Sequence, residues 1–462
     1  MSARVAVIGA GLAGAAAALT LREAGCDVVQ LADGPGATAL IGGTLDVAGA
    51  SPGIATLPWR DPLRGNALLP RERLALHRRG AATHPYAQLF GAGAEIDRAE
   101  REIEASMLRL AGWLAPEGLG VAGSLAANRL LPSVPGTLRS ADYALASVAG
   151  TDVLQAEELA VVDLPALEGW DARALVRTLA HELESLGLRK LPLRVVQLAL
   201  PERMQHERSP ARLAAQLDAA GARAELAKAV AGIGAEGHVL LFPPVLGLAA
   251  NAAVIEALEA ASGSRVGEAL AFPPHAVSGY RLQRALDAAV RRAGAERVDG
   301  RVHSVVAAER DRLELQRVDG QPLRLAVDAV VLATGRFVGG GLEAGPDAVR
   351  EPLVSLPLYD GDGRRIDGIP AHRSARKGYG NEQPLFSAGV RTDRRLRPLG
   401  GQGHPQHPRL FAAGDLLGGF DPGRERTGLG VALLSGIHAG RAAAESLRAP
   451  HQGFAAAAGG MP

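Results

Sequence analysis

The sequence predicts an α/β fold that both ends of the chain build together around an inserted α+β region. Near the start, an apolar strand at residues 4–8 leads into a Gly-rich turn, an Ala-rich helix to about Ala24 and a second strand, Val28 to Leu31. Near the end, a strand at residues 410–413 leads into another Gly-rich turn and a helix from about Gly428 to Leu447. The chain therefore starts and ends in strand–turn–helix units, and its middle is inserted between them.

The middle of the chain has a different pattern of elements. A short buried strand is predicted at Val239–Phe242, among helical patterns at 94–113, 171–187, 209–220, 248–262 and 280–293. Short strands follow from residue 296 onward, at 298–307, 312–317, 323–326 and 328–333. The 462 residues suffice for two or three domains of about 100–200 residues each.

We divide the chain into six consecutive parts. They are a nucleotide-binding domain, first part, at 1–75; an inserted, largely helical α+β region that caps the substrate at 76–294; a second part of the nucleotide-binding domain at 295–345; a substrate or cap segment at 346–400; the C-terminal part of the nucleotide-binding domain at 401–448; and a disordered tail at 449–462.

Composition excludes several classes of function. Fifty basic and 49 acidic residues give a net charge of +1, which offers no electrostatic case for binding nucleic acid. The only cysteine, Cys26, cannot form a disulfide framework, a four-thiolate zinc site or an iron–sulfur cluster. The histidines show no metal-ligand spacing, so we expect no metal. The sequence has no signal peptide and no apolar run of the roughly 20 residues that span a membrane, so we expect a cytoplasmic location.

The Gly-rich turn near the start has the spacing of a nucleotide-binding motif. Gly9 allows the tight turn, Gly11 lets the backbone approach a pyrophosphate, and Gly14 permits close packing of the helix on the strand. Leu12 and Ala13 open the helix, whose N-terminal N–H groups and dipole favour phosphate. With a strand before it and a helix and strand after it, this motif predicts a Rossmann-like domain.

The acid that usually binds the ribose is displaced in this sequence. The position at the end of the second strand is Ala32, and Asp33 follows one residue later. Either Asp33 substitutes through a shift of the backbone, or the ribose lacks its carboxylate partner. The sequence therefore leaves two cofactors open, FAD and the shorter FMN.

Two later segments resemble two-dinucleotide-fold flavoproteins. Residues Val327–Gly335 resemble their "ATG" strand, and Leu410–Asp415 resemble their C-terminal "GD" strand. The resemblance implies that Asp415 binds a ribityl hydroxyl and that the following helix directs its N-terminal N–H groups at the flavin N1 and C2 carbonyl. The residues assigned to the flavin here are Thr334, Gly335, Gly414, Asp415, Gly428, Gly430 and Val431.

A loop near the start completes the predicted flavin site. Gly42, Gly43 and Thr44 lie where such proteins place backbone against flavin N5, although a simple turn is equally compatible with the two glycines. Flavoproteins of the fumarate-reductase type can attach FAD to a histidine near this loop. The first histidine here is His77, far beyond the loop, so we expect a non-covalent flavin.

Five segments resemble one family, the B subunits of the anaerobic glycerol-3-phosphate dehydrogenase. They are Ile41–Val47, Pro135–Arg139, Phe242–Leu248, Pro273–Leu282 and Phe411–Pro422. The resemblance implies a flavoprotein subunit, peripheral on the inner face of the cell membrane. Its partners would be a second flavin subunit and an iron–sulfur membrane-anchor subunit. Such a complex oxidises sn-glycerol 3-phosphate, a polyol phosphate, to dihydroxyacetone phosphate and passes the electrons to a quinone.

Two other functions remain open at this point. One is an electron-transfer or assembly subunit whose flavin has no substrate site of its own. The other is a stand-alone flavin oxidoreductase for a different hydroxy acid or polyol.

A phosphate substrate directs attention to arginine, whose planar fork makes paired charge-assisted hydrogen bonds. Arg426 lies where fumarate-reductase-like flavoproteins carry a substrate-binding arginine, and we choose it over its neighbour Arg424. Arg139 and Arg281 fall in the family segments and are further candidates to close over a substrate. For Arg391, a structural ion pair is the preferred interpretation.

Acid–base chemistry has fewer candidates. Asp421 stands where that group of flavoproteins has a site histidine, and it either contacts substrate or caps the following turn. Histidine is the commonest base near neutral pH, and His275, in a family segment, is our candidate. His372 adjoins Arg373 in an irregular segment. His404 and His407 lie in a loop rich in glycine and proline, which is typical of a solvated turn.

Overall fold

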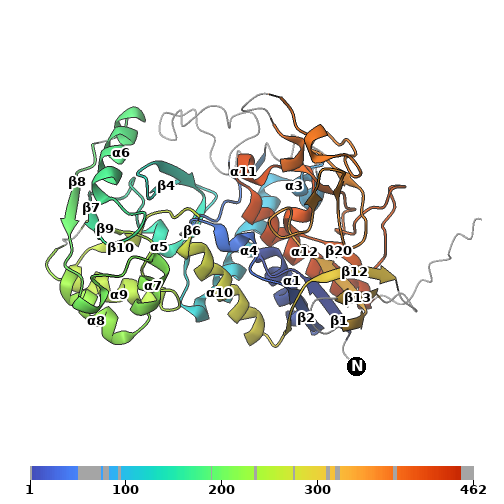
Figure 1. The fold of residues 1–462 in the computed structure, drawn as a ribbon, viewed down its shortest axis with the longest axis horizontal. Coiled ribbons are helices and arrows are strands. Elements are labelled where there is room, and N and C mark those ends of the chain that lie inside the picture. Colours follow the sequence, from blue (N-terminus) through green and yellow to red (C-terminus); the bar gives the residue numbers. More distant parts are fainter. Residues whose placement is uncertain are drawn as a thin grey trace, which may run out of the picture.

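The structure is a computed structural model. It describes residues 3–49, 74–75, 83–91, 95–188, 190–233, 237–273, 276–307, 313–317, 323–377 and 382–448. Its described residues form two lobes, seen side by side in Figure 1. The first lobe contains both ends of the described chain, and the second contains the green segment of the figure.

The first lobe is built on a five-stranded parallel sheet in the order β11-β2-β1-β15-β20. Its strands are β1 (Arg4–Ile8), β2 (Asp27–Ala32), β11 (Glu296–Asp299), β15 (Ala329–Leu332) and β20 (Leu410–Ala412). Val7 pairs with Gln30 on one side and with Val331 on the other, and Val331 pairs with Phe411. Segments about 400 residues apart therefore share one sheet, which confirms the predicted α/β fold assembled from both ends of the chain.

Two helices pack tightly together on this sheet. They are α1 (Leu12–Glu23) and α12 (Gly428–Arg448). A Cβ on Gly436 would lie 2.4 Å from the carbonyl oxygen of Ala13, and one on Gly440 would lie 2.8 Å from that of Ala17. Small residues on both helices thus allow their backbones to approach closely.

Two helices from the middle of the chain join the same core. They are α4 (Ile96–Leu114) and α10 (Val277–Arg292), and their side chains Ile103, Leu110, Leu282 and Leu286 are buried with those of α1. The nearby α3 (Pro85–Phe90) contacts α12. The middle of the chain is therefore divided between the two lobes.

The predicted strand at 298–307 is two strands. Gly300, with φ +137°, turns the chain between β11 and β12 (Val302–Ala307). β12 leaves the main sheet and pairs antiparallel with β13 (Leu313–Arg317), which pairs with β14 (Leu323–Val327). The spacing of apolar residues does not mark this break. The turn depends instead on the backbone conformation of Gly300, which only glycine adopts readily.

The second lobe contains a four-stranded parallel sheet in the order β10-β9-β7-β8. Its strands are β7 (Glu158–Asp163), β8 (Leu193–Gln197), β9 (His238–Phe242) and β10 (Arg265–Glu268), with helices α6 (Ala172–Ser185), α7 (Pro210–Leu217), α8 (Ala220–Val230) and α9 (Asn251–Ser262). Of these strands the sequence predicted only β9, whereas its helical patterns at 171–187, 209–220 and 248–262 correspond to α6, α7 and α9. Strands of four to six residues carry too little pattern to separate them from helix, so the parallel α/β arrangement was missed.

Further short elements occur in the described chain, and β5, β16 and α11 among them contribute residues to the cavity described below. They are β3 (Val121–Gly123), β4 (Arg129–Pro132), β5 (Leu138–Ala141), β6 (Tyr143–Leu145), α5 (Ala146–Ala149), β16 (Glu343–Ala344), β17 (Val349–Arg350), β18 (Leu358–Tyr359), β19 (Gly389–Val390) and α11 (Pro422–Glu425). The strands among them form antiparallel pairs, β3 with β6, β4 with β5, β16 with β17 and β18 with β19.

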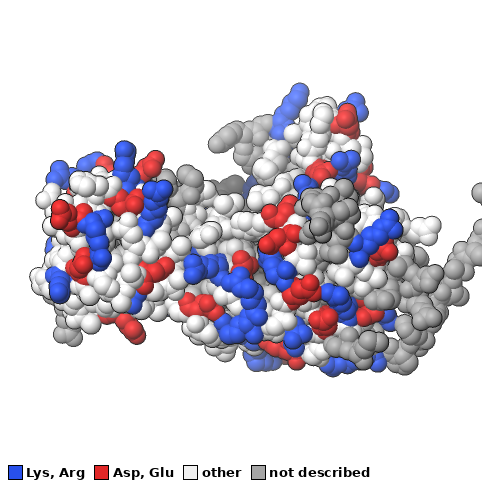
Figure 2. Space-filling view, turned by 60° about the horizontal axis from the view of Figure 1, so that its bottom comes forward, with Lys and Arg blue, Asp and Glu red and all other residues white. Residues whose placement is uncertain are grey.

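Charged side chains of both signs are interspersed over both lobes on the face drawn in Figure 2. Within the described part of the chain, no helix is both long and apolar enough to cross a membrane.

Candidate functional site

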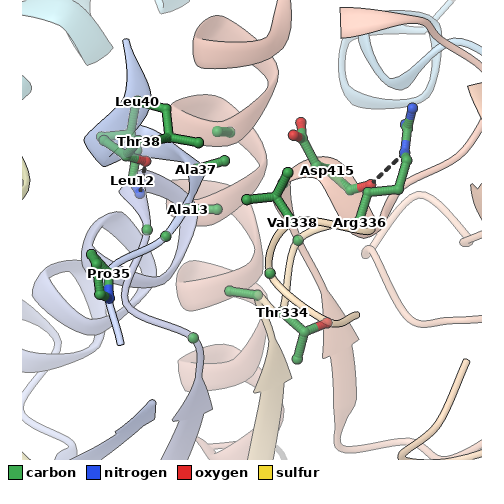
Figure 3. A pocket seen from close by; sticks show the side chains of 18 of the residues that line it. Leu12, Ala13, Pro35, Ala37, Thr38, Leu40, Thr334, Arg336, Val338 and Asp415 are labelled. Carbon is green, nitrogen blue, oxygen red and sulfur yellow. Dashed lines mark hydrogen bonds between the residues drawn. The ribbon is translucent and has the colours of Figure 1, made fainter. Parts of the chain in front are cut away.

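A cavity of about 1000 Å³ opens at the carboxyl ends of the parallel strands of the first lobe. Its walls come from the turn after β1, the loop after β2, the turn after β15, and the segment from β20 to the start of α12. Figure 3 shows these elements facing one another across the space. Ligands of open α/β sheets bind at this edge, and the volume suits a large organic cofactor.

The glycines of the first turn let three backbone segments meet. Gly9 has φ +114°, and a Cβ there would lie 2.1 Å from the carbonyl oxygen of Ala333 on the neighbouring strand. A Cβ on Gly14 would lie 2.1 Å from the carbonyl oxygen of Gly9, so Gly14 packs the helix on the strand as the motif predicts. Gly11 faces the backbone of Gly36 and lines the cavity.

One helix N–H in this turn already has a partner. Thr38 Oγ1 accepts a hydrogen bond of 2.9 Å from the N–H of Leu12, in the first turn of α1 (Figure 3). Ala13 lines the cavity beside it. Asp33 is exposed at the edge of the cavity, one residue beyond the end of β2. The structure thus places Asp33 within reach of the cavity in spite of the displaced position.

Two polar side chains of the cavity wall need a partner that the described protein does not supply. The carboxylate of Asp415 accepts no hydrogen bond from any described residue, and in Figure 3 it points away from Arg336. Burial raises the pKa of Asp415, and the charge of Arg336 opposes that increase. Thr334 Oγ1 is buried without a hydrogen-bond partner among the described residues. A hydroxyl-bearing cofactor fits this carboxylate, whereas the Thr334 hydroxyl is enclosed beside Gly341.

Arg336 holds the two flavin-type motifs together. Its guanidinium donates to the main-chain oxygens of Asp415, Phe386, Leu417 and Phe420, and it lies 5.3 Å from the ring centre of Phe420. Burial lowers its pKa, and the charges of three acidic side chains, led by Asp415, oppose that decrease. The residue after the "ATG" segment therefore fixes the "GD" segment through its carbonyl groups, a role that the sequence did not reveal.

The loop at Gly42 is fixed against a segment from the second lobe. Gly42 accepts a hydrogen bond from the N–H of Ala271, and a Cβ on Gly42 would lie 2.3 Å from the carbonyl oxygen of Ala271. Gly43 has φ +118° and packs on Val148. Thr44 lines the cavity and bridges to Ala144.

An ion pair follows directly in this loop. Asp46 Oδ2 accepts a hydrogen bond from the Arg139 guanidinium on β5, and both side chains line the cavity. Asp46 is 7% exposed, whereas a third of the Arg139 side chain remains exposed. Beneath the loop, Asp142 accepts hydrogen bonds from the N–H groups of Val47 and Ala48.

Arg426 lines the same cavity in a strained conformation. Its backbone is left-handed, with φ +55° and ψ +47°, at the end of α11. Burial lowers the pKa of Arg426, the charge of Arg139 lowers it further, and Asp46 opposes both. Two arginines and one carboxylate thus converge at the end of the cavity that the Gly42 loop forms.

Comparison with known proteins agrees with this geometry. A family model described as FAD binding domain matches residues 4–431. A protein of Halobacterium salinarum, named as the probable B subunit of an anaerobic glycerol-3-phosphate dehydrogenase, is 30% identical, over 97% of this chain and 99% of its own. The B subunit of the enzyme of the same name from Yersinia pestis is 28% identical, over 94% of this chain and 96% of its own.

This chain belongs to the B-subunit family of the anaerobic glycerol-3-phosphate dehydrogenase. It is a flavin oxidoreductase subunit, and its cofactor is FAD. Among solved structures, a 3-ketosteroid dehydrogenase of Rhodococcus jostii is similar at 16% identity and a TM-score of 0.37, covering 96% of this chain and 97% of its own. A flavocytochrome c3 fumarate reductase is similar at 12% identity and a TM-score of 0.36, covering 96% and 78%.

Most of the residues that we assigned to the cofactor line the cavity of this family member. Those that do are Gly9, Gly11, Leu12, Ala13, Asp33, Gly42, Thr44, Thr334, Gly335, Gly414, Asp415 and Gly428. Gly14, Gly43, Gly430 and Val431 do not line it. The assignment of Gly430 to the cofactor is corrected, because its N–H donates to the carbonyl oxygen of Asp46 and its Cα faces the Tyr86 hydroxyl and Val47. It positions the Asp46 loop, so the N–H groups available to FAD are those that precede it in α12.

The other arginine candidates have partners in the fold. Arg281 is 2% exposed and makes a two-pronged ion pair with Glu268 at 2.8 and 3.0 Å, so it is structural. Arg391 lies 3.9 Å from the ring centre of Tyr359 and donates to the carbonyl oxygen of Gly363. The structural ion pair predicted for Arg391 is therefore wrong, and the residue stacks on an aromatic ring instead. Arg424 Nε lies 3.8 Å from a carboxylate oxygen of Glu382.

The acid–base candidates are placed differently from one another. Asp421 lines the cavity, but its Oδ1 accepts from the N–H groups of Gly423 and Arg424, so it caps α11. His275 lies outside the described residues. His372 and His404 are exposed, and neither they nor His407 line the cavity.

A buried histidine that the sequence did not reveal supports the turn before Arg426. His84 Nδ1 accepts from the N–H of Tyr86, so its Nε2 carries the proton and donates to Glu425 at 3.1 Å. Glu425 also accepts from the N–H of Asp421. A Cβ on Gly49 would lie 2.0 Å from the carbonyl oxygen of Arg426. These contacts cross long stretches of chain, so no spacing in the sequence predicts them.

Proposed function

We propose that this chain oxidises sn-glycerol 3-phosphate to dihydroxyacetone phosphate. The observation that carries the proposal is the pair of cavity-lining arginines, Arg139 and Arg426, beside the Gly42 loop. The family relatives bear the name of an enzyme for this substrate. The chain has side chains of the type that a phosphorylated substrate requires, at the end of the cavity that the Gly42 loop forms.

Phosphate binding gives the two arginines a physical reason to be together. Two like charges in a partly buried site repel each other, which agrees with the lowered pKa of Arg426, caused first by burial and then by Arg139. A phosphate dianion would offset both charges. Arginine suits it because the planar fork donates two parallel charge-assisted hydrogen bonds.

FAD, when bound, supplies the hydride acceptor for this reaction. The residues that would hold it are the glycine turn at Gly9 and Gly11 and the carboxylate of Asp415. The first turn of α12 contributes its N–H groups and the positive end of the helix dipole. We further propose that FAD is held without a covalent bond to the chain.

The reaction also needs a route for the electrons. We propose that partner subunits, a second flavin subunit and an iron–sulfur membrane-anchor subunit, carry them to a quinone. Each of the relatives is named as the B subunit of its enzyme, which supports an assembly of several chains. The single Cys26 cannot ligate an iron–sulfur cluster, so such clusters would belong to other chains.

Anaerobic spectroscopy tests the proposal. The FAD-loaded chain, alone and with its partner subunits, is titrated with sn-glycerol 3-phosphate while the flavin absorbance is followed. We expect bleaching by this substrate and none by glycerol, which lacks the phosphate. Bleaching only in the presence of the partner would assign substrate oxidation to the partner. Equal bleaching by glycerol would refute the phosphate site.

Replacing Arg426 by Lys provides the matched variant. Lysine keeps the positive charge but loses the fork, so we expect a higher concentration of substrate for half-maximal bleaching and little change in the FAD spectrum. An unchanged concentration dependence would remove Arg426 from the phosphate site.

A further inference from the structure

We propose that Asp46 is the base that takes the proton of the substrate hydroxyl, and that substrate phosphate draws Arg139 away from it. This inference rests on the proposed function. It assigns the general base, for which the sequence offered only histidines. It also explains why an arginine of the proposed phosphate site is paired with a carboxylate.

Hydrogen bonds from α12 and from Tyr86 hold the backbone around Asp46 in place. Its carbonyl oxygen accepts a hydrogen bond of 3.1 Å from the N–H of Gly430 in α12. The carbonyl oxygen of the next residue, Val47, accepts a bond of 2.6 Å from the buried Tyr86 hydroxyl. The side chain therefore lines the cavity from a loop that these hydrogen bonds hold in place.

The two oxygens of Asp46 have different surroundings. Oδ2 accepts from Arg139 and lies 3.4 Å from the Thr44 hydroxyl. No described residue donates to Oδ1, although the side chain lines the cavity. A carboxylate with one anchored oxygen and one oxygen open to the cavity has the geometry of a general base.

The other acids of the cavity wall are poorly suited to act as the base, because of their partners or their positions. Asp421 caps α11, and Asp415 is the carboxylate that fits the cofactor. Glu343 pairs with Arg301 and Arg350. Asp33 follows the end of β2, near the nucleotide-binding turn.

Histidine is also poorly placed for this role. Among the described histidines only His303 lines the cavity, and it is exposed on β12. The turn before it lies at the end of β2, because Gly300 donates to the carbonyl oxygen of Ala32. His303 is therefore on the nucleotide side of the cavity, and Asp46 is left as the acid beside the two arginines.

Arg139 connects substrate binding to the base. Its bond to Asp46 uses Nη2, and a third of the side chain is exposed, so the guanidinium has donor capacity beyond this bond. When phosphate binds between Arg139 and Arg426, it competes with Asp46 for the same positive charge. A carboxylate that loses a cationic partner in a buried site becomes more basic.

Three charged groups from different elements face Asp46. Arg139 on β5 and Arg426 after α11 are the cations, and the buried Asp142 between β5 and β6 is the neighbouring anion. Burial, followed by the charge of Asp46, raises the pKa of Asp142 to about 6.

The chemical step balances without a further reactant. The O–H bond of the substrate's secondary alcohol breaks, and its proton passes to Asp46 Oδ1. The C–H bond at the same carbon breaks, and its hydrogen leaves with the electron pair to FAD. The C–O bond becomes a carbonyl, so the substrate loses two electrons and the cofactor gains them.

The test compares Asp46→Asn with wild type in the FAD-loaded complex. Asparagine keeps the shape and cannot take the proton, so we expect bleaching by sn-glycerol 3-phosphate to slow by about 10²–10⁴-fold. Wild type should bleach faster as pH rises, and the variant should lose this dependence. Asp46→Glu should recover part of the rate.

A second readout does not depend on turnover. Binding of inorganic phosphate to the FAD-loaded chain is measured by calorimetry, and Asp46→Asn should bind it more tightly than wild type because Arg139 is released. A merely structural role for Asp46 would weaken phosphate binding together with FAD retention. The matched control is Glu158→Gln, which removes a carboxylate paired with Arg194 in the second lobe and should change neither readout.

The outcomes separate this inference from the proposed function. Slow bleaching with tighter phosphate binding supports Asp46 as the base. Wild-type bleaching rates in Asp46→Asn, or phosphate binding no tighter than wild type, overturn it. If wild type binds phosphate but sn-glycerol 3-phosphate never bleaches FAD, the proposed substrate fails, and tighter phosphate binding in Asp46→Asn still supports the exchange at Arg139.

Discussion

Replacing Arg426 by Gly should stabilise the chain while weakening its phosphate site. Arg426 has φ +55° and ψ +47°, a conformation that costs a residue with a Cβ about 1–2 kcal/mol and glycine almost nothing. Glycine loses about 0.5–1 kcal/mol more backbone entropy on folding, so the net gain from the backbone is about 0.5–1 kcal/mol. Removal of a half-buried charge beside Arg139 acts in the same direction.

The loss of binding should be larger than the gain in stability. Hydrogen bonds to a charged group contribute about 1.5–3 kcal/mol, which corresponds to roughly 10- to 150-fold weaker binding of phosphate. Stability is measured by urea unfolding of the FAD-free chain, and phosphate affinity by calorimetry on the FAD-loaded chain. Strain of this size at a binding residue is expected where function, and not folding, selects the side chain.

The control for this experiment is Ser355→Gly. Ser355 is exposed, has φ +59° and does not line the cavity, so it should gain similar stability without any change in phosphate affinity. If Arg426→Gly lowers the free energy of unfolding, the Arg426 side chain stabilises the fold. If it leaves phosphate affinity unchanged, Arg426 does not bind phosphate.

Three further changes test other parts of the site. Burial raises the pKa of Asp142 from 3.8 to about 6, so as the pH falls the folded chain takes up this proton before the unfolded chain does. The free energy of unfolding should therefore rise by about 1 kcal/mol from pH 7 to pH 5. Asp142→Asn should lose this increase in urea titrations, and an unchanged dependence of the free energy on pH would contradict the assignment. Asp415→Asn should weaken FAD binding by about tenfold or more, measured by equilibrium dialysis, because a charge-assisted acceptor is lost, whereas the FAD-free chain should be no less stable. Arg336→Met leaves four carbonyl oxygens, two of them in buried bonds, without their donor and should cost about 3 kcal/mol in urea unfolding; a smaller loss than for the exposed Arg350→Met would refute its role.

The sequence predicted the Gly-rich turns of the cavity wall well, because the constraints on these turns are local. Gly9 and Gly14 are required by backbones that approach to within van der Waals contact, and such a requirement appears as a short motif at fixed spacing. Asp415 and Gly428 were predicted for the same reason, since each follows a strand or begins a helix. The order of these motifs along the chain also determined that both ends build one domain.

The sequence did not predict how distant charges pair. Asp46 and Arg139 are 93 residues apart, and His84 meets Glu425 across 341 residues. The sequence placed Asp46 and Arg139 in separate family segments, but only the fold brings them to one end of the cavity. The parallel sheet of the second lobe was missed for a related reason, because its strands are recognised by their neighbours and not by their own pattern.

Sequence alone thus indicated a flavin, with FAD and FMN both open, together with the family and the Gly-rich turns of a nucleotide-binding fold, because the positions of glycine and of short apolar runs reflect backbone geometry. Only the tertiary structure decided which of the candidate residues line the cavity. It placed Arg281 in a buried ion pair, Asp421 in a helix cap, and Arg139 with Arg426 and Asp46 in the cavity. The reason is that a charged side chain is defined by its partners, and those partners come from other elements of the fold.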